Sequence, residues 1–148
     1  MRKLFALMLL SIWGSLFAAE PAPPIEITHP WARATVPGQA ASGAFMEIRS
    51  PVAAVITGLS SPVAGVVQIH EMVANGDRMS MRPVARLTLP ASTTVELRPN
   101  GMHVMLLDLR VPLSAGQHFP LTFEISEPGG RKAQATVDVE VRALGSTP

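Results

Sequence analysis

Short runs of apolar and β-branched residues, separated by turn formers, recur along most of the chain and restrict it to β-structure. The turn segments are rich in Gly, Pro, Asn and Asp, as in "VPGQAASG", "RPNG" and "EPGGRK". No window of ten or more residues shows a helical period. The pattern predicts a single all-β domain of about eight short strands in a Greek-key β-sandwich or barrel. The predicted strands cover residues 44–49, 54–57, 65–73, 78–89, 93–98, 103–109, 119–125 and 133–142.

The N-terminus has the pattern of a secretory signal peptide. It reads "MRKLFALMLLSIWGSLFAAE", in which two cationic residues precede a mainly apolar run of 14 residues that ends before two alanines. This run is shorter than the roughly 20 residues that cross a bilayer. We therefore expect residues 1–19 to be a signal peptide, cut after Ala18 or Ala19. Residues 20–148 would then be a soluble periplasmic domain without a transmembrane segment.

Charge and cysteine content narrow the possible partners and metal centres. The formal net charge is +1, and it falls by two to −1 once Arg2 and Lys3 are removed with the signal peptide. Such a near-neutral surface gives no basis for binding nucleic acid or anionic lipid. The chain has no cysteine. Blue-copper and dinuclear thiolate centres are therefore not expected, because both require cysteine ligands.

The segment "HEMVANGDRMSM", which starts at residue 70, has the pattern of a β-hairpin. Its Asn-Gly pair favours a two-residue type I′ turn, because both central positions of that turn need positive φ. This turn would pair His70 with Met81 and Met72 with Met79. Side chains alternate between the two faces of a strand, so all four would share one face. Opposite residues then hold their Cβ atoms roughly 4.5–5.5 Å apart, which suits two ligands of one metal ion.

A second His-x-Met pair, His103 and Met105, also points to one face of its strand. Five of the six methionines that remain after signal cleavage lie within residues 70–105. Neutral imidazole and thioether favour soft Cu(I) over hard cations. Because imidazole must lose its proton to bind a metal, we expect Cu(I) affinity to fall as the pH drops through roughly 6.5.

Other interpretations of these residues stay open on composition and spacing alone. Methionine is a flexible core filler, and a metal-free β-sandwich adaptor could use exposed methionines as a contact patch. Zinc hydrolysis is disfavoured because "HEMVA" lacks the second histidine of HExxH. Serine hydrolysis is disfavoured because no G-x-S-x-G is present. We therefore expect a protein that is not an enzyme.

The spacing resembles the copper motif of the PCu(A)C-type periplasmic copper chaperones, which is a His, ten residues, a Met, twenty-one residues and His-x-Met. His70, Met81, His103 and Met105 fit this spacing without a gap. The segments "HPWARAT", "SSPVAGVVQIHEM", "RPNGMHVML" and "PLSAGQHFPLTFEI" extend the resemblance over nearly the whole mature chain. One departure is Asn100 before Gly101, where the family more often has Gly-Gly.

The resemblance implies a cupredoxin-like β-sandwich or barrel that binds one Cu(I) per chain. The ligands it implies are His70, Met81, His103 and Met105. It also implies a function, which is the delivery of copper by ligand exchange for assembly of the copper centre of cytochrome c oxidase. The acceptor would be cytochrome c oxidase subunit II or a thiol-bearing assembly factor, and we expect a monomer. A periplasmic copper buffer or resistance protein is the alternative.

The remaining methionines, histidines and cations are expected to surround the site or to support the fold. Met72 and Met79 share the predicted face but lie outside the motif, so we expect them to be soft neighbours or alternate ligands during transfer. Structural roles are expected for Met46 (core), Met102 (turn packing), Trp31 (buried ring), Arg33 (fixing a loop), His29 (structural or solvated) and His118 (loop).

Overall fold

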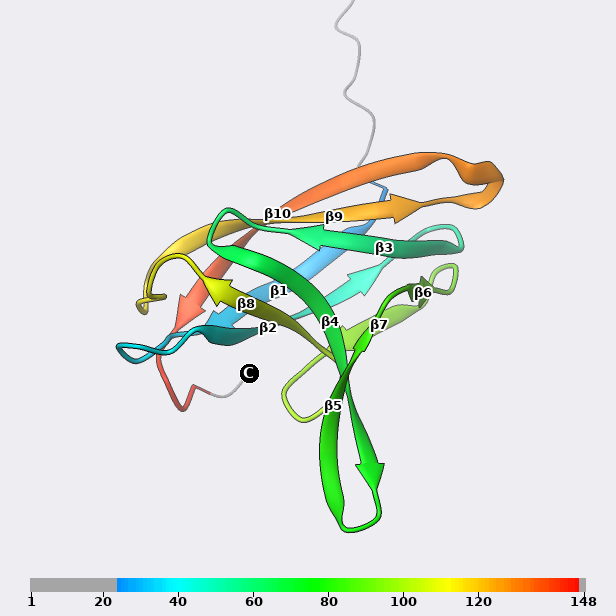
Figure 1. Ribbon diagram of the computed structural model, residues 1–148. Helices are drawn as coiled ribbons and strands as arrows, with labels where there is room; N and C mark the ends of the chain where they lie inside the picture. Colours follow the sequence, from blue (N-terminus) through cyan, green and yellow to red (C-terminus); the bar gives the residue numbers. More distant parts are fainter. Residues whose placement is uncertain (1–23, 147–148) are drawn as a thin grey trace, which may run out of the picture.

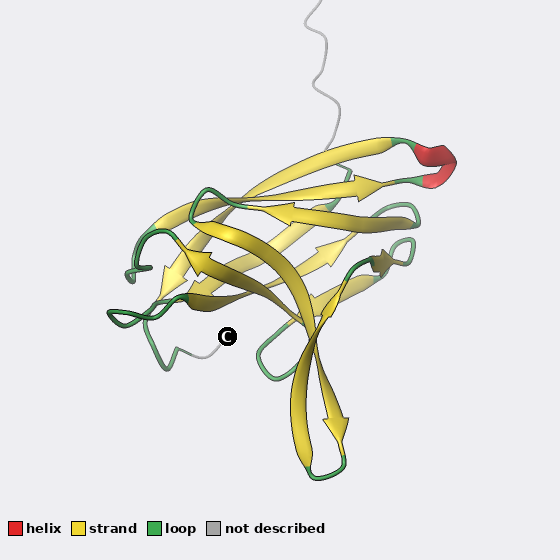
Figure 2. Cartoon of the chain, in the orientation of Figure 1, coloured by secondary structure: helices red, strands yellow, loops and turns green. Residues whose placement is uncertain are grey.

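Ten strands and one short 3₁₀ turn make up residues 24–146, the part of the chain that the computed structural model describes (Figures 1 and 2). The predicted all-β fold is confirmed, and the signal peptide predicted over residues 1–19 lies outside the described residues. None of the helical segments in this described part is long and apolar enough to span a membrane. The elements are β1 (Glu26–Arg33), β2 (Ala41–Arg49), β3 (Ala54–Ser60), β4 (Ala64–Asn75), β5 (Arg78–Val84), β6 (Leu87–Leu89), β7 (Thr94–Leu97), β8 (His103–Leu109), β9 (His118–Ser126), η1 (Pro128–Gly130) and β10 (Lys132–Arg142).

The strands form one sheet that folds over itself. Their order is β5-β4-β8-β2-β1-β10-β9-β3-β6, and β7 lies beside β2. β1 and β10 are parallel, and the other strand pairs are antiparallel. Figure 1 shows β10, β9 and β3 lying over β1, β2 and β8, so the apolar faces of both halves meet in one core. The core includes the fully buried side chains Ile48, Ile56, Leu106, Leu121 and Phe123.

β1 is a central strand that the sequence did not predict, because its proline reads as part of a lead-in segment. A proline inside a central strand removes a ladder hydrogen bond and is tolerated at a bulge. The pairing of β1 with β2 shifts between Thr28 and Trp31, and His29 in this interval has a φ of 51°. The extra residue accommodates Pro30 and brings Trp31 opposite Phe45.

The predicted strand 78–89 is divided into two strands that pair with different partners. β5 pairs with β4, whereas β6 pairs with β3. Ala85 and Arg86 lie between β5 and β6. Residues 78–89 contain no Gly, Asn or Asp that would mark a turn, and Pro83 lies within β5 itself, so no turn signal marked the change of partner.

The hairpin of β4 and β5 projects from the body of the sandwich (Figures 1 and 2). The predicted turn is wrong by one position, because Asn75 pairs with Arg78 and the turn residues are Gly76 and Asp77. Gly76 has a φ of 64°, whereas Asp77 is not among the residues with positive φ. A glycine first and an ordinary residue second is the φ pattern of a type II′ turn rather than type I′.

The corrected register changes the partners but leaves the faces as predicted. Met81 lies opposite Met72, and Met79 lies opposite Ala74, so Met81 is not the direct partner of His70. A shift of one residue on one strand would turn its side chains to the other face. Here each strand is displaced by one residue, so His70 and the three hairpin methionines still share a face.

Replacement of Ile48 with alanine is expected to lower the free energy of unfolding by about 2–5 kcal/mol, since it leaves a cavity between the two layers. Ile48 is 0% exposed. Denaturant unfolding measures the change, and Val52→Ala, at a 43% exposed turn position, is the control expected to stay within about 0.5 kcal/mol of the parent. A loss for Ile48→Ala as small as that of the control would contradict the core position.

Candidate metal centre

Strands β4, β5 and β8 bring the four predicted ligand residues to one face of the sheet, opposite the core. His70 of β4 lies directly opposite His103 of β8, and their ring centroids are 6.4 Å apart. Met105 follows two residues after His103 on the same face. Met81 of β5 joins this face through its pairing with Met72 of β4. The core side of β8 is taken by Val104, which is 0% exposed.

A cavity of about 280 Å³ opens on this face. Three of the predicted ligand residues line it, namely Met81, His103 and Met105, and Met72 lines it as well. His70 is not part of the lining, and it adjoins the cavity through its neighbour His103. The other lining residues are Arg33, Gly43, Phe45, Pro99 and Asn100.

The imidazole of His103 is held in one orientation. It is 7% exposed, and its Nδ1 lies 2.9 Å from the carbonyl oxygen of Gly101. A carbonyl only accepts hydrogen bonds, so Nδ1 carries the proton and donates it. The lone pair of His103 is therefore on Nε2, and the backbone turn before β8 fixes the tautomer, as in many metal-binding histidines.

The imidazole of His70 has the opposite arrangement. Its Nε2 lies 3.1 Å from the side-chain oxygen of Gln68, which accepts a hydrogen bond from the ring. Its Nδ1 is buried and has no hydrogen-bond partner within residues 24–146. A buried acceptor without a partner costs free energy, and such atoms in native proteins call for an explanation. A cation bound at this atom would satisfy it.

Burial keeps His70 in the neutral form that a metal requires. Desolvation lowers the pKa of His70 below its ordinary value of 6.5, and the nearby His103 lowers it further. The ring of His70 is therefore mainly neutral at pH 7, and its Nδ1 lone pair is free to bind a metal.

The donor set fits a soft ion. Among residues 24–146, there is no group of three or more His, Asp or Glu side chains that could hold a metal ion. The described part of the chain therefore has no zinc-type site built from three histidine and carboxylate side chains. The cavity instead combines imidazole nitrogen with thioether sulfur, which suits Cu(I).

Two aromatic rings, those of Trp31 and Phe45, extend in a row from the imidazole of His103. The rings of Trp31 and Phe45 lie 4.6 Å apart, and those of Phe45 and His103 lie 6.2 Å apart. The guanidinium of Arg33 lies 5.3 Å from the centre of the Phe45 ring. The prediction that Trp31 is buried is confirmed, but Arg33 covers Phe45 and lines the cavity rather than fixing a loop.

Phe45 was missed in the sequence because it alternates with core residues in an ordinary strand pattern. Its ring lies over Gly43, where a Cβ atom would come within 3.0 Å of the ring. The only indication in the sequence was therefore the small residue two positions before it. Together they form the floor of the cavity beside His103.

The other predicted structural residues lie apart from this face. Met46 is buried in the core, and Met102 packs against it, which confirms both predictions. His29 is exposed, with Nδ1 3.8 Å from Glu47. His118 begins β9 rather than lying in a loop, because it continues the pairing of β9 with β10, and its Nδ1 lies 2.7 Å from an oxygen of Asp138.

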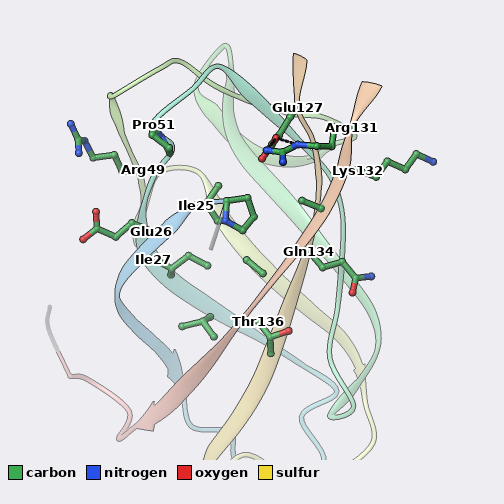
Figure 3. A pocket seen from close by; sticks show the side chains of 14 residues that line it. Ile25, Glu26, Ile27, Arg49, Pro51, Glu127, Arg131, Lys132, Gln134 and Thr136 are labelled. Carbon is green, nitrogen blue, oxygen red and sulfur yellow. Dashed lines mark hydrogen bonds and ion pairs between the residues drawn. The ribbon is translucent and has the colours of Figure 1, made fainter. Parts of the chain in front are cut away.

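A larger cavity, of about 1120 Å³, lies where the N-terminal parts of β1 and β10 diverge (Figure 3). Its walls are mainly apolar, with the Glu127–Arg131 ion pair at one end. Within the described range 24–146, no histidine or methionine lines this cavity, so these residues offer it no soft metal ligand. The apolar side chains in its wall are Ile25, Ile27, Ala133, Ala135 and Val137.

The chain is similar in sequence to bacterial proteins whose names refer to lipoproteins. Residues 25–141 match the sequence model of the LpqE-like family, which is described as a family of lipoproteins. One relative is the lipoprotein Lxx21020 of Leifsonia xyli subsp. xyli. It is 30% identical to this chain over 104 residues, which are 70% of the chain. The matched region spans 63% of the length of that relative.

Solved structures share the fold. The copper-bound PCuAC domain from PmoF2 superimposes with a TM-score of 0.65 at 24% identity, over 81% of this chain and 93% of that domain. The structure of CuI-DR1885 from Deinococcus radiodurans superimposes with a TM-score of 0.59 at 26% identity, over 88% of this chain and 84% of the other. The predicted cupredoxin-like β-sandwich or barrel is confirmed.

The metal-free protein is expected to lose stability as the pH falls below 6.5, partly through His70. The unfolded chain binds a proton at this ring near pH 6.5, whereas the folded chain binds it only at lower pH, so acid favours unfolding between the two values. Denaturant unfolding at pH 7.5 and pH 5.5 should therefore show a smaller acid-induced loss in His70→Gln than in the parent. Equal losses in both proteins would contradict the lowered pKa.

Proposed function

Because the chain belongs to the LpqE-like family and has the fold of the PCuAC domains, we propose that it is a periplasmic Cu(I)-binding metallochaperone. The observation that carries the proposal is the buried Nδ1 of His70, which has no hydrogen-bond partner among residues 24–146 and lies beside His103 on a face lined with thioethers. Copper is the cargo of such a protein rather than a cofactor of a reaction. The copper in the PmoF2 domain and the Cu(I) in DR1885 support the identity of the metal.

One Cu(I) per chain would be bound by two nitrogens and two sulfurs. The nitrogen donors are Nδ1 of His70 and Nε2 of His103, whose other ring nitrogens are engaged by Gln68 and Gly101. The sulfur donors are Met81 and Met105. Thioethers suit an oxidising compartment, because they do not form disulfides as thiolates do. All four donors are uncharged, so the bound ion keeps its single positive charge.

The four donors differ in how firmly the fold holds them. His103 and Met105 belong to β8, which is paired on both sides, with β2 and β4. Met81 belongs to β5, which ends the sheet, and its side chain is 52% exposed. Release would therefore begin with Met81, whose place an acceptor thiolate can take, since thiolates bind Cu(I) more strongly than thioethers. Copper stays monovalent throughout, and only ligands exchange.

We further propose where the protein works and which protein receives its copper. Residues 1–19 act as the signal peptide and residues 20–148 as the mature periplasmic domain, in line with the family's lipoprotein description. The acceptor is cytochrome c oxidase subunit II or a thiol-bearing assembly factor, and the chain works as a monomer. We propose carriage of copper and no enzymatic reaction.

Anaerobic titration against a Cu(I) chelator is expected to show one tightly bound Cu(I) per chain. His103→Ala should weaken Cu(I) binding by more than about 100-fold, because it removes a ligand. Loss of a residue that only supports a ligand typically weakens metal binding by about 10- to 100-fold. Met46→Leu, a volume-conserving change in the core, is the control with unchanged affinity. A parent protein without stoichiometric binding would leave only the metal-free adaptor.

Transfer of the metal separates a chaperone from a buffer or resistance protein. The Cu(I)-loaded protein is expected to pass its copper to a reduced oxidase copper domain, or to a thiol-bearing assembly factor, within the mixing time of the experiment. The copper content of both proteins after their separation on a column measures the transfer. Copper that stays with the loaded protein while a small chelator removes it readily would favour the buffer.

A further inference from the structure

The projecting hairpin carries a second group of sulfur donors that the four-residue motif does not include. Met72 and Met81 lie directly opposite one another, and Met79 follows opposite Ala74. Opposite residues in such a pair hold their Cβ atoms roughly 4.5–5.5 Å apart, and diagonal ones about 7–8 Å, within reach of long side chains. The alanine opposite Met79 leaves room for its thioether to turn toward the other two.

Exposure argues against packing as the role of these methionines. Met79 is 60% exposed and Met81 is 52% exposed, the two most exposed methionines of the described residues. β5 is the end strand of the sheet, and Figure 1 shows the hairpin standing clear of the sandwich. Methionines that fill a core gap are buried, as Met46 is.

The charged side chains of the hairpin lie on its other face. Glu71 and Arg82 face one another across the strands and form an ion pair of 2.6 Å. Arg78 follows on the same side as Arg82. The methionine face is thus free of charged side chains from both strands, which leaves sulfur as the only strong metal-binding group between His70 and the hairpin tip.

The thioether face continues into the candidate metal centre. Met72 and Met81 line the same cavity as His103 and Met105, whereas Met79 lies one step further out, toward the hairpin tip. Met81 is therefore common to both groups. A metal ion held at the hairpin can therefore pass to the cavity while it stays bound to Met81.

We propose that Met72, Met79 and Met81 form a thioether-only entry site for Cu(I), an inference that rests on the proposed function. Three neutral sulfurs select soft monovalent ions, Cu(I) and its analogue Ag(I), over hard or divalent cations. The ion then moves inward when Met81 keeps its bond and the nitrogens of His70 and His103 replace the sulfurs of Met79 and Met72. No electron is transferred, and one set of donor bonds replaces another.

The test removes both imidazoles and asks whether the hairpin still binds a soft ion. His70→Ala/His103→Ala is expected to bind one Ag(I), more weakly than the parent. Addition of Met79→Leu should weaken this binding at least about 10-fold, because one of three donors is lost while side-chain volume is conserved. Addition of Met46→Leu is the matched control and should leave it unchanged. An equal affinity with and without Met79→Leu would overturn the entry site.

A rate measurement in the otherwise intact protein tests the same site without removing the histidines. Met79→Leu alone should leave the equilibrium Cu(I) affinity within about twofold of the parent and slow Cu(I) uptake several-fold. Trp31 is the single tryptophan of residues 20–148 and lies beside Phe45 at the cavity, so its fluorescence can follow uptake. An unchanged uptake rate would overturn the proposal.

The outcomes for the two proposals are distinct. A parent that binds one Cu(I) and a double-histidine variant that binds no Ag(I) would overturn the entry site alone. A parent without stoichiometric Cu(I) binding would overturn the proposed function. Met79→Leu is on an exposed strand position, so its effect does not depend on a change in the core.

Discussion

The pairing of β4 with β8 holds the candidate site together, because each strand has one face in the core and one face at the site. Ile69 and Val104 pair with one another and are 2% and 0% exposed. Their neighbours His70 and His103 also pair, and they point the other way. Burial of Ile69 and Val104 stabilises the pairing of the two strands by about 25 cal/mol per Å² of apolar surface. The same pairing fixes the separation of the two imidazoles. The core thus determines the spacing of the two candidate ligands, although it lies on the other face of the sheet.

The same sheet combines rigidity with mobility. β8 lies inside the sheet, so both of its edges are hydrogen-bonded, whereas β5 is hydrogen-bonded only to β4. Strands at an edge with few buried contacts open at lower free energy than central ones. A site shared between them can hold its ligands on β8 in place while those on β5 exchange. This division suits a carrier, which has to bind copper firmly and also release it.

Sequence reasoning succeeded where side-chain alternation alone decides the outcome and failed where backbone detail decides it. The face shared by His70 and Met81 follows from the period of a strand, so it survived a wrong turn assignment. The turn itself depended on whether Asn75 or Asp77 completes a glycine turn, and the sequence favours either. β1 was hidden because Pro30 argues against a strand, and only the bulge at His29 shows why the proline is tolerated.

The supporting residues of the site were beyond sequence reasoning for a different reason. Gln68 and Gly101 act through single hydrogen bonds to His70 and His103, and hydrogen bonds of this kind have no sequence pattern. They can be recognised only when the distances are known. The motif therefore identified the candidate ligands, whereas the structure identifies which atom of each ring is available.

The choice of ring nitrogen has a consequence for where the ion lies. Nδ1 lies closer to the backbone than Nε2, so a metal bound by Nδ1 of His70 would lie close to β4, and one bound by Nε2 of His103 would lie further from β8. The two tautomers together would place such an ion nearer the β4–β5 hairpin than β8. Met81 and Met72 are on that side. The hydrogen bonds from Gln68 and Gly101 would thus direct a bound ion toward the thioethers of the hairpin, the side from which an acceptor could reach it.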